Sequence, residues 1–461
     1  MENFIPILNA IDSFMWGPPL ITLLVGTGIY LTIRLGLLQV VRLPLALSLI
    51  FRAKNKGEGD VSSFKALCLA LAATVGTGNI VGVATAVKVG GPGALFWMWV
   101  AAFFGMATKY AEGLLAVKYR STDDKGEIAG GPMFYIENGM GKKYRPLAIF
   151  FAFSCILVAF FGIGTFPQVN AIVDSVNISF GVPKYATDIG ITLLIAAITL
   201  GGIQSISRVS AAIVPFMAVA YLVICTGLIS LHFADIPAAI SLILDSAFTG
   251  TAAVGGFAGS TIMIAMQNGI ARGVFSNESG LGSAPIAAAA AKTKWPAEQG
   301  LISMTGTFID TIIICSLTGL TLVLTGVWSG DTSGAAMTSA AFAGSFGDIG
   351  SQLLTLALVL FAFTTILGWN YYGERACLYL FGIKSILPYR LIFIVLVASG
   401  AFLKLEAIWV LADIVNGLMA IPNLIALIAL SGVVVAETKA YLAYRQAEDA
   451  NEDAKPESSI Q

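Results

Sequence analysis

Apolar runs with few charged residues recur along this chain, and most reach the ~20 helical residues needed to cross a bilayer. They fall at residues 13–36, 64–88, 93–119, 146–175, 186–203, 208–232, 256–291, 300–328, 349–381, 388–403 and 407–441. Only 11% of the 461 residues are charged, against roughly a quarter in soluble proteins. The runs therefore predict an all-α membrane protein with about 11 transmembrane helices.

Composition and charge argue against several other classes of protein. The net charge of −1 gives no reason to expect a nucleic-acid partner. The single histidine, His232, cannot form a multi-histidine metal site. The five cysteines lie in apolar runs without a close pairing motif, so we expect them to be small buried side chains. The N-terminus has no Lys or Arg ahead of its first apolar stretch, which argues against a cleaved signal peptide.

Basic residues concentrate in alternate loops, and such loops face the cytoplasm. The loops at 89–92, 233–250 and 329–348 are poor in Lys and Arg. We therefore expect the N-terminus outside the cell membrane and the C-terminus inside. The basic loops contain Arg42, Arg52, Lys54, Lys56, Lys118, Arg120, Lys125, Lys142, Lys143, Arg145, Arg208, Lys292, Lys294, Lys384 and Arg390.

The expected helices divide into one N-terminal helix and two halves of five helices with opposite topology. This arrangement is typical of transporters built from inverted repeats. The predicted parts are an N-terminal helix with a basic loop (1–62), the first repeat (63–232), an extracellular connection (233–255), the second repeat (256–444) and a disordered polar tail (445–461).

Each half begins with a run that polar residues interrupt near mid-span. The sequences are ATVGTGNIVG at 73–82 and GVFSNESGLG at 273–282. A helix broken inside the membrane exposes N–H groups that attract a carboxylate and C=O groups that attract a cation. Gly76 and Gly78 would let a ligand reach the backbone, although Gly78 and Gly82 also form a small-xxx-small packing motif. Because the two breaks correspond, we expect a binding site.

Glu278 and Asp310 lie inside apolar runs, where a charge is costly and usually functional. Glu278 belongs to the second break and has Arg272 nearby in the sequence. It either takes part in the site, pairs with Arg272 or caps the following half-helix. For Asp310, in GTFIDTIIICSLTG, we expect a hydrogen bond or ion pair between helices in preference to contact with substrate.

Two further stretches carry polar groups inside expected spans. FAFTTILGW (361–369) has adjacent threonines, which either bond back to their own helix or provide oxygens for a sodium ion. FGIGTFPQVNA (161–171) places Gln168 beside Pro167, and a proline there frees a backbone carbonyl. We expect Gln168 to face the central cavity.

With these motifs in view, the chain resembles the alanine or glycine:cation symporter family, within the leucine-transporter-like superfamily. The resemblance covers essentially the whole chain. Its most specific stretch is AGGPMFYIENGM (129–140), supported by TVGTGNIVG and by GVFSNESGLGSAP (273–285). It implies a leucine-transporter-like 5+5 inverted repeat with one extra N-terminal helix.

The resemblance also implies site residues. The substrate would contact Thr77 and Gly78 (at its carboxylate), Gln168, Phe275, Ser276, Asn277, Ile366 and Trp369. A sodium ion would bind the carbonyls of Ala72, Val75 and Phe361 and the hydroxyls of Thr364 and Thr365. Asn79 matches a position that binds a second sodium in some relatives, but the sequence does not identify that site's other ligands.

We therefore expect sodium-coupled symport of a small neutral amino acid, alanine or glycine, into the cell by alternating access. The expected partners are that amino acid, Na⁺ and the lipid bilayer, without an organic cofactor. Bulky residues near the breaks (Phe166, Phe275 and Trp369) favour a small substrate. Proton coupling is the alternative. A channel is a weaker alternative, since the chain lacks filter-like repeats. An intramembrane enzyme is also weaker, since the chain lacks the motifs HExxH and GxSxG.

Overall fold

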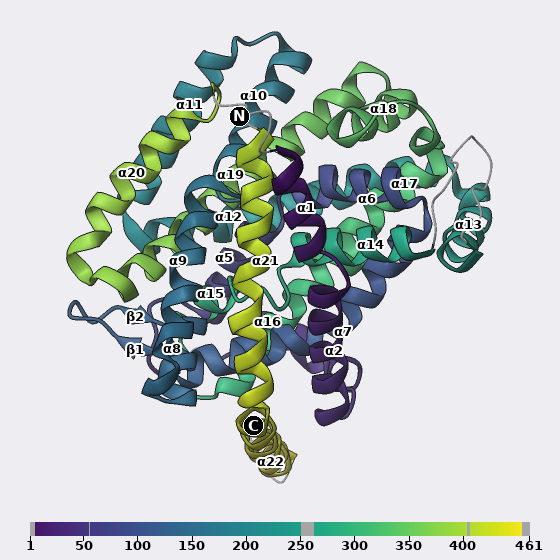
Figure 1. Ribbon diagram of the computed structural model, residues 1–461. Helices are drawn as coiled ribbons and strands as arrows, with labels where there is room; N and C mark the ends of the chain where they lie inside the picture. The colour runs from purple at the N-terminus through teal and green to yellow at the C-terminus, as the bar shows by residue number, and fades with distance from the viewer. Residues whose placement is uncertain (1–4, 55, 250–261, 403–405, 454–461) are drawn as a thin grey trace, which may run out of the picture.

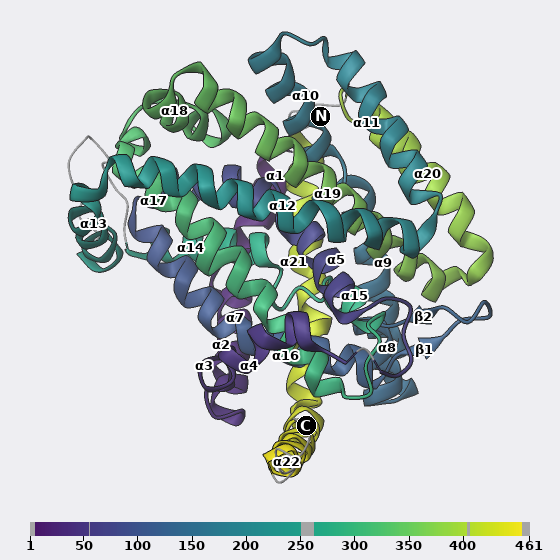
Figure 2. The same ribbon diagram turned by 180° about the vertical axis from the view of Figure 1, so that it is seen from behind.

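The computed structural model describes residues 5–54, 56–249, 262–402 and 406–453, which form an almost entirely helical molecule (Figures 1 and 2). Within these residues, the strands are the short antiparallel pair β1 (Ser121–Thr122) and β2 (Ile128–Ala129), with Ser121 opposite Ala129. The first helix, α1 (Ile5–Met15), and the last, α22 (Ser431–Asp453), lie toward opposite ends of the molecule in both views. This placement suits a chain whose ends lie on opposite sides of a membrane.

The elements up to the connection follow the expected runs, and several helices begin beside a proline, whose missing N–H costs nothing in a first turn. After α1 they are α2 (Pro18–Arg34), α3 (Leu38–Val41), α4 (Leu43–Arg52), α5 (Ser63–Thr74), η1 (Gly78–Gly82), α6 (Val83–Gly90), α7 (Gly93–Lys118), α8 (Pro132–Tyr135), η2 (Ile136–Met140), η3 (Lys142–Tyr144), α9 (Arg145–Phe161), α10 (Phe166–Phe180), α11 (Lys184–Thr199) and α12 (Gly202–Leu231). The leading run of the first repeat is therefore α5, η1 and α6.

The second half begins in the same way, with a helix that stops at its polar break. Its elements, with those of the connection, are η4 (Phe233–Asp235), α13 (Ile236–Thr249), α14 (Ile262–Asn277), α15 (Pro285–Ala289), α16 (Pro296–Thr307), η5 (Phe308–Cys315), α17 (Ser316–Thr325), η6 (Val327–Ser329), α18 (Gly334–Phe346), α19 (Asp348–Phe381), η7 (Ile383–Ser385), α20 (Ile386–Ser399) and α21 (Glu406–Ala429), followed by α22. The matching leading run is therefore α14 and α15.

By length and composition, the described residues contain six helices that can span a membrane, or up to eight if each bent pair is one span. The bent pairs are Ser63–Thr74 with Gly78–Gly90 (51°) and Asp413–Ala429 with Ser431–Glu448 (59°). Three other expected runs fall on α11, α14 and α20, which have 16, 16 and 14 residues. The expected count of eleven therefore stays a prediction.

The structure departs from the sequence expectations at three places. The tail predicted to be disordered from Arg445 is helical as far as Asp453, and Glu448 within it pairs with Arg445 one turn earlier and with Lys54. The connection at 233–255 contains helix α13, while residues 250–261 and 454–461 lie outside the described part. The runs 146–175 and 407–441 each consist of two helices.

The two broken helices lie side by side in the middle of the molecule and run in opposite directions. Helix α5, the first half of the first broken helix, packs against α15, the second half of the other broken helix. Helix α6 packs against α14. This crossed pairing is what an inverted repeat requires. Helix α7 packs along α14 and α16, while α12 and α19 pack against α5. Both breaks are therefore enclosed by long helices.

The basic loops expected on one side of the membrane do meet at one end of the molecule. The Arg120 guanidinium donates to the carbonyls of Ala291 (2.8 Å) and Glu58 (2.7 Å), which lie in two other loops. Asp60 accepts from the N–H of Ile128 at 2.9 Å, and burial raises the pKa of Asp60. The loops at 56–62, 118–131 and 289–294 thus form one connected layer.

Candidate substrate and cation site

The first break leaves the N–H groups of Gly76 and Thr77 outside the helical hydrogen-bond pattern, since both donate to side chains. Helix α5 ends at Thr74, and the chain continues as the single π-turn η1 before α6 begins. The Asn79 carboxamide oxygen accepts from the N–H of Gly76 at 2.9 Å and so stabilises the turn. A π-turn inside a helix often marks a functional site.

The glycines of this break allow protein atoms to approach closely. A Cβ on Gly76 would lie 2.4 Å from the Thr365 hydroxyl, and one on Gly78 would lie 3.2 Å from the Cα of Ser276. At Gly82 a Cβ would meet nothing within 4 Å. Small-xxx-small packing therefore explains Gly78 but not Gly82.

Gln168 contacts the first break, and its expected place in a central cavity stays a prediction. It lies in the first turn of α10, directly after Pro167, the second residue of the helix. Its side-chain N–H donates to the Thr77 hydroxyl (3.0 Å) and to the carbonyl of Ile163 (3.1 Å), and its oxygen accepts from the Thr77 N–H at 3.4 Å. Thr77 and Gln168 are fully or almost fully buried.

The second break follows Asn277, the last residue of α14, and extends over 278–284. Glu278 has a φ of +56°, which is uncommon for a residue other than glycine. Its carboxylate accepts from the Trp369 indole N–H at 3.0 Å and from the Ser283 hydroxyl. Such a conformation persists only when its surroundings hold it in place.

Two charged residues of α7 hold the second break, and the sequence analysis did not identify them. The Lys109 ammonium donates to the carbonyl of Asn277 at 2.8 Å, at the C-terminal end of α14. One Glu112 oxygen accepts from the N–H groups of Gly280 and Gly282, both at 3.1 Å. A cation thus meets the carbonyl end of one half-helix, and an anion meets amides that precede the other.

Asp310, in η5, connects the two breaks. Its carboxylate accepts from the Asn79 amide at 2.7 Å and from the Ser276 hydroxyl at 2.9 Å. Thr311 donates to the same carboxylate at 2.8 Å and accepts from Asn277 at 3.0 Å. The hydrogen bond between helices expected for Asp310 is therefore present. This network places the oxygens of Asp310, Ser276 and Thr311 near Asn79.

The threonines expected to bind sodium lie on α19 beside the first break. Both hydroxyls, of Thr364 and Thr365, donate to the carbonyl of Phe361 at 3.0 Å, so the local bonding of helical threonines does occur. A Cβ on Gly368 would lie 2.8 Å from the backbone of Ala73, which places α19 directly against α5. The Thr365 hydroxyl lies against the first break, since a Cβ on Gly76 would lie 2.4 Å from it, whereas the Thr364 hydroxyl lies 3.6 Å from the sulfur of Met217 on α12. The expected ligand residues Ala72 and Val75 are buried at the end of α5.

The other residues expected to surround the substrate lie on different sides of the two breaks. Trp369 contacts the second break through Glu278, and a Cβ on Gly164 would lie 2.7 Å from its Cβ. Ile366 is fully buried on the same helix. The Phe275 ring lies against Gly78, 3.5 Å from the position of an added Cβ. The structure thus brings Thr77, Gly78, Gln168 and Ser276 into one connected cluster bounded by aromatic rings.

Comparison with known proteins decides which family this arrangement belongs to. The model of the sodium:alanine symporter family matches residues 1–455. The chain belongs to the sodium:alanine symporter family. It is 49% identical over 457 residues to the sodium/alanine symporter AgcS of Methanococcus maripaludis, covering 97% of this chain and 100% of that protein. It is 60% identical over 437 residues to an uncharacterized transporter of Haemophilus influenzae, covering 94% and 95%.

The fold of this sodium:alanine symporter family member is leucine-transporter-like. The crystal structure of MhsT in complex with L-phenylalanine matches with a TM-score of 0.59 at 12% identity, covering 83% of this chain and 93% of that one. Family membership makes the chain a multi-pass membrane transporter and not an enzyme. The expected family and fold class are both confirmed.

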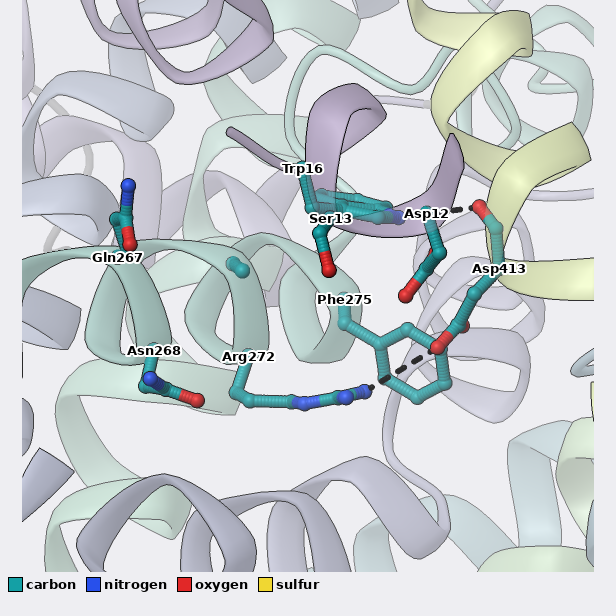
Figure 3. A pocket seen from close by; sticks show the side chains of 9 residues that line it. Asp12, Ser13, Trp16, Gln267, Asn268, Arg272, Phe275 and Asp413 are labelled. Carbon is teal, nitrogen blue, oxygen red and sulfur yellow. Dashed lines mark hydrogen bonds and ion pairs between the residues drawn. The ribbon is translucent and has the colours of Figure 1, made fainter. Parts of the chain in front are cut away.

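On the side of α1, this symporter family member has a cavity of about 200 Å³ that reaches Phe275 (Figure 3). Arg272 pairs with Asp413 of α21 at 3.6 Å, and its guanidinium lies 5.6 Å from the centre of the Phe275 ring. The alternative that Arg272 pairs with Glu278 is therefore wrong, because Arg272 points toward the cavity. The N-cap position of α15 is Ala284, so Glu278 does not cap that helix either.

Proposed function

We propose that this chain is a sodium-coupled symporter of small neutral amino acids, with alanine and glycine as substrates. The amino acid binds between the two breaks, with its carboxylate at the backbone of Thr77 and Gly78. Gln168, Phe275, Ser276, Asn277, Ile366 and Trp369 surround it. Uptake into the cell proceeds by alternating access, with the N-terminus outside and the C-terminus in the cytoplasm.

One observation carries this proposal: the breaks of two oppositely directed helices meet, and one carboxylate joins them. A Cβ on Gly78 would lie 3.2 Å from Ser276, and Asp310 accepts from both Asn79 and Ser276. Interrupted helices at a repeat interface present N–H groups to a carboxylate and carbonyls to a cation. The sequence match to AgcS, named a sodium/alanine symporter, supports the same substrate and ion.

The coupling ion binds where α19 meets the end of α5. The ligands we propose are the carbonyls of Ala72, Val75 and Phe361 and the hydroxyls of Thr364 and Thr365. Oxygen atoms are the ligands that hard cations prefer. A sodium ion there stabilises the contact between α5 and α19, so each ligand raises the affinity for the other. A second sodium near Asn79 is supported by the adjacent oxygens of Asp310, Ser276 and Thr311.

The size of the surrounding side chains supports a small substrate. Phe275 lies against Gly78, and Trp369 is fully buried beside Glu278. Enlarging a substrate in a closely packed pocket forces unfavourable shifts of its walls. We therefore propose that alanine and glycine are transported in preference to leucine.

The deciding experiment is uptake of labelled alanine by the purified chain in liposomes. An inward sodium gradient should drive accumulation of alanine above its external concentration. Moving one elementary charge through a membrane potential of 100 mV supplies about 2.3 kcal/mol. A potassium gradient of equal ionic strength is the control. Accumulation that ignores the sodium gradient would refute the coupling.

Proton coupling is separated in the same liposomes. A proton ionophore should leave sodium-driven uptake unchanged, whereas a pH gradient without sodium should drive none. Uptake that follows the pH gradient would instead make the chain a proton-coupled carrier. An ohmic current independent of substrate would favour a channel.

A further inference from the structure

A basic pocket lies at the end of the molecule where the C-terminal helix α22 is found, outside the site described above. It has a volume of about 280 Å³ and lies between α4, the turn before α16, and α22. Figure 2 shows α4 and α16 close together at the end of the molecule from which α22 projects. Five basic residues line the pocket: Arg52, Lys54, Lys56, Lys294 and Arg445.

The pocket has an excess of positive charge. The carboxylates among its lining residues belong to Glu298 and Glu448, so three positive charges remain in excess. Glu448 pairs with Lys54 at 2.5 Å and with Arg445 at 3.4 Å. Arg52, Lys56 and Lys294 are all exposed. A pocket of this charge is suited to an anionic group.

The same pocket lies at the boundary of the membrane. Trp295 and Tyr444 line it and stack with ring centroids 4.8 Å apart, and such aromatic side chains concentrate at membrane interfaces. Phe51, next to Arg52 on the apolar helix α4, is 81% exposed. The candidate membrane span Pro296–Thr325 starts with α16, one residue after Trp295. Lipid chains therefore have an apolar surface directly beside the basic one.

We propose that this basic pocket binds the phosphate-bearing headgroup of an anionic phospholipid. Lys and Arg hold the phosphate through charge-assisted hydrogen bonds, while Trp295, Tyr444 and Phe51 contact the glycerol and acyl region. Basic pockets at the inner side of membrane helices bind such headgroups. A free phosphate would use the charges but would leave the apolar contacts unused, so the lipid is the ligand that fits the whole surface.

The test is native mass spectrometry of the purified full-length chain in a neutral detergent, titrated with phosphatidylglycerol. The K56Q/K294Q variant removes two exposed charges from the pocket. The control, K142Q/K143Q, removes two exposed charges from another loop at the same end of the molecule. We expect wild-type and control chains to bind phosphatidylglycerol equally, and K56Q/K294Q to bind it roughly tenfold more weakly.

Further variants and lipids in the same binding measurement separate the possible causes of weaker binding. The charge-preserving K56R/K294R variant should bind as the wild type does, which separates loss of charge from disturbed folding. Phosphatidylcholine should bind weakly to every variant. The proposal is overturned if K56Q/K294Q binds phosphatidylglycerol as tightly as the control does. Equal binding of phosphatidylcholine, or complete displacement of the lipid by millimolar inorganic phosphate, would overturn it as well.

Discussion

The side-chain amide of Asn79 donates a hydrogen bond of 2.7 Å to Asp310, whose other oxygen accepts from Ser276 at 2.9 Å. Asn79 belongs to the first break, Ser276 precedes the second, and Asp310 lies on neither helix. One fully buried carboxylate thus sets the distance between the two breaks. Its hydrogen bonds lie beside the position that we propose for the substrate.

We expect Asp310→Asn to reduce alanine uptake by tenfold or more. An amide has one accepting oxygen, so its NH2 group must face either Asn79, which also donates, or the hydroxyls of Ser276 and Thr311, which then lose their acceptor. A buried donor without its acceptor costs about 1–3 kcal/mol. Uptake in liposomes measures the effect, and Asp331→Asn in an exposed loop is the control. Wild-type uptake by Asp310→Asn would contradict this view of the site.

The glycines of the first break provide a matched set of substitutions. Gly76→Ala and Gly78→Ala should each abolish most uptake, because the new Cβ would lie 2.4 Å from the Thr365 hydroxyl or 3.2 Å from the Cα of Ser276. Gly82→Ala should retain it, since nothing lies within 4 Å. Uptake by all three variants, with surface expression measured in parallel, checks the prediction. Equal loss in all three would show that the close approach is not the cause.

The proposed sodium ligands predict a change in ion dependence. Removing both hydroxyls in Thr364→Ala/Thr365→Ala should raise the sodium concentration for half-maximal uptake by about tenfold or abolish coupling, since a hard cation loses two oxygens. The Thr364→Ser/Thr365→Ser variant keeps both oxygens and should behave as the wild type does. An unchanged sodium dependence in the alanine variant would rule out this ion site.

The hydrogen bonds of Glu112 predict different results for two substitutions. Glu112→Gln keeps an oxygen that can accept from Gly280 and Gly282, so it should lower the melting temperature only slightly. Glu112→Ala leaves both amides and Asn423 without this acceptor and should lower it by several degrees more. Thermal unfolding in detergent compares them. If both variants lose equal stability, the negative charge matters more than the accepted hydrogen bonds.

The aromatic ring beside the first break predicts a change in selectivity. Phe275→Ala removes the ring that lies against Gly78 and should let larger neutral amino acids, such as leucine, compete with alanine. Competition by unlabelled amino acids in liposomes measures this, and Phe51→Ala on exposed α4 is the control. A Phe275→Ala variant that still excludes leucine would place the size limit elsewhere.

The sequence by itself determined the membrane class, the places of the two breaks, and the polar residues in them. These are local properties: an apolar run long enough to span must be a helix in lipid, and glycines with polar residues at mid-span interrupt it. The family resemblance added the roles that we propose for Thr77, Gln168 and the threonine pair. Lys109 and Glu112 are also charged residues inside an apolar run, as Glu278 is. The rule that such residues are usually functional would therefore have identified them from the sequence.

Only the tertiary structure decided which of these residues meet. Glu278 contacts Trp369, 91 residues away, while Arg272 pairs with Asp413, so nearness in sequence gave the wrong partner. Glu448 of the helical tail pairs with Lys54, 394 residues away. Buried polar groups take whichever partners the packing of helices brings to them. The sequence pattern does not predict this packing, because helix packing depends on the fit between surfaces of residues far apart in the sequence.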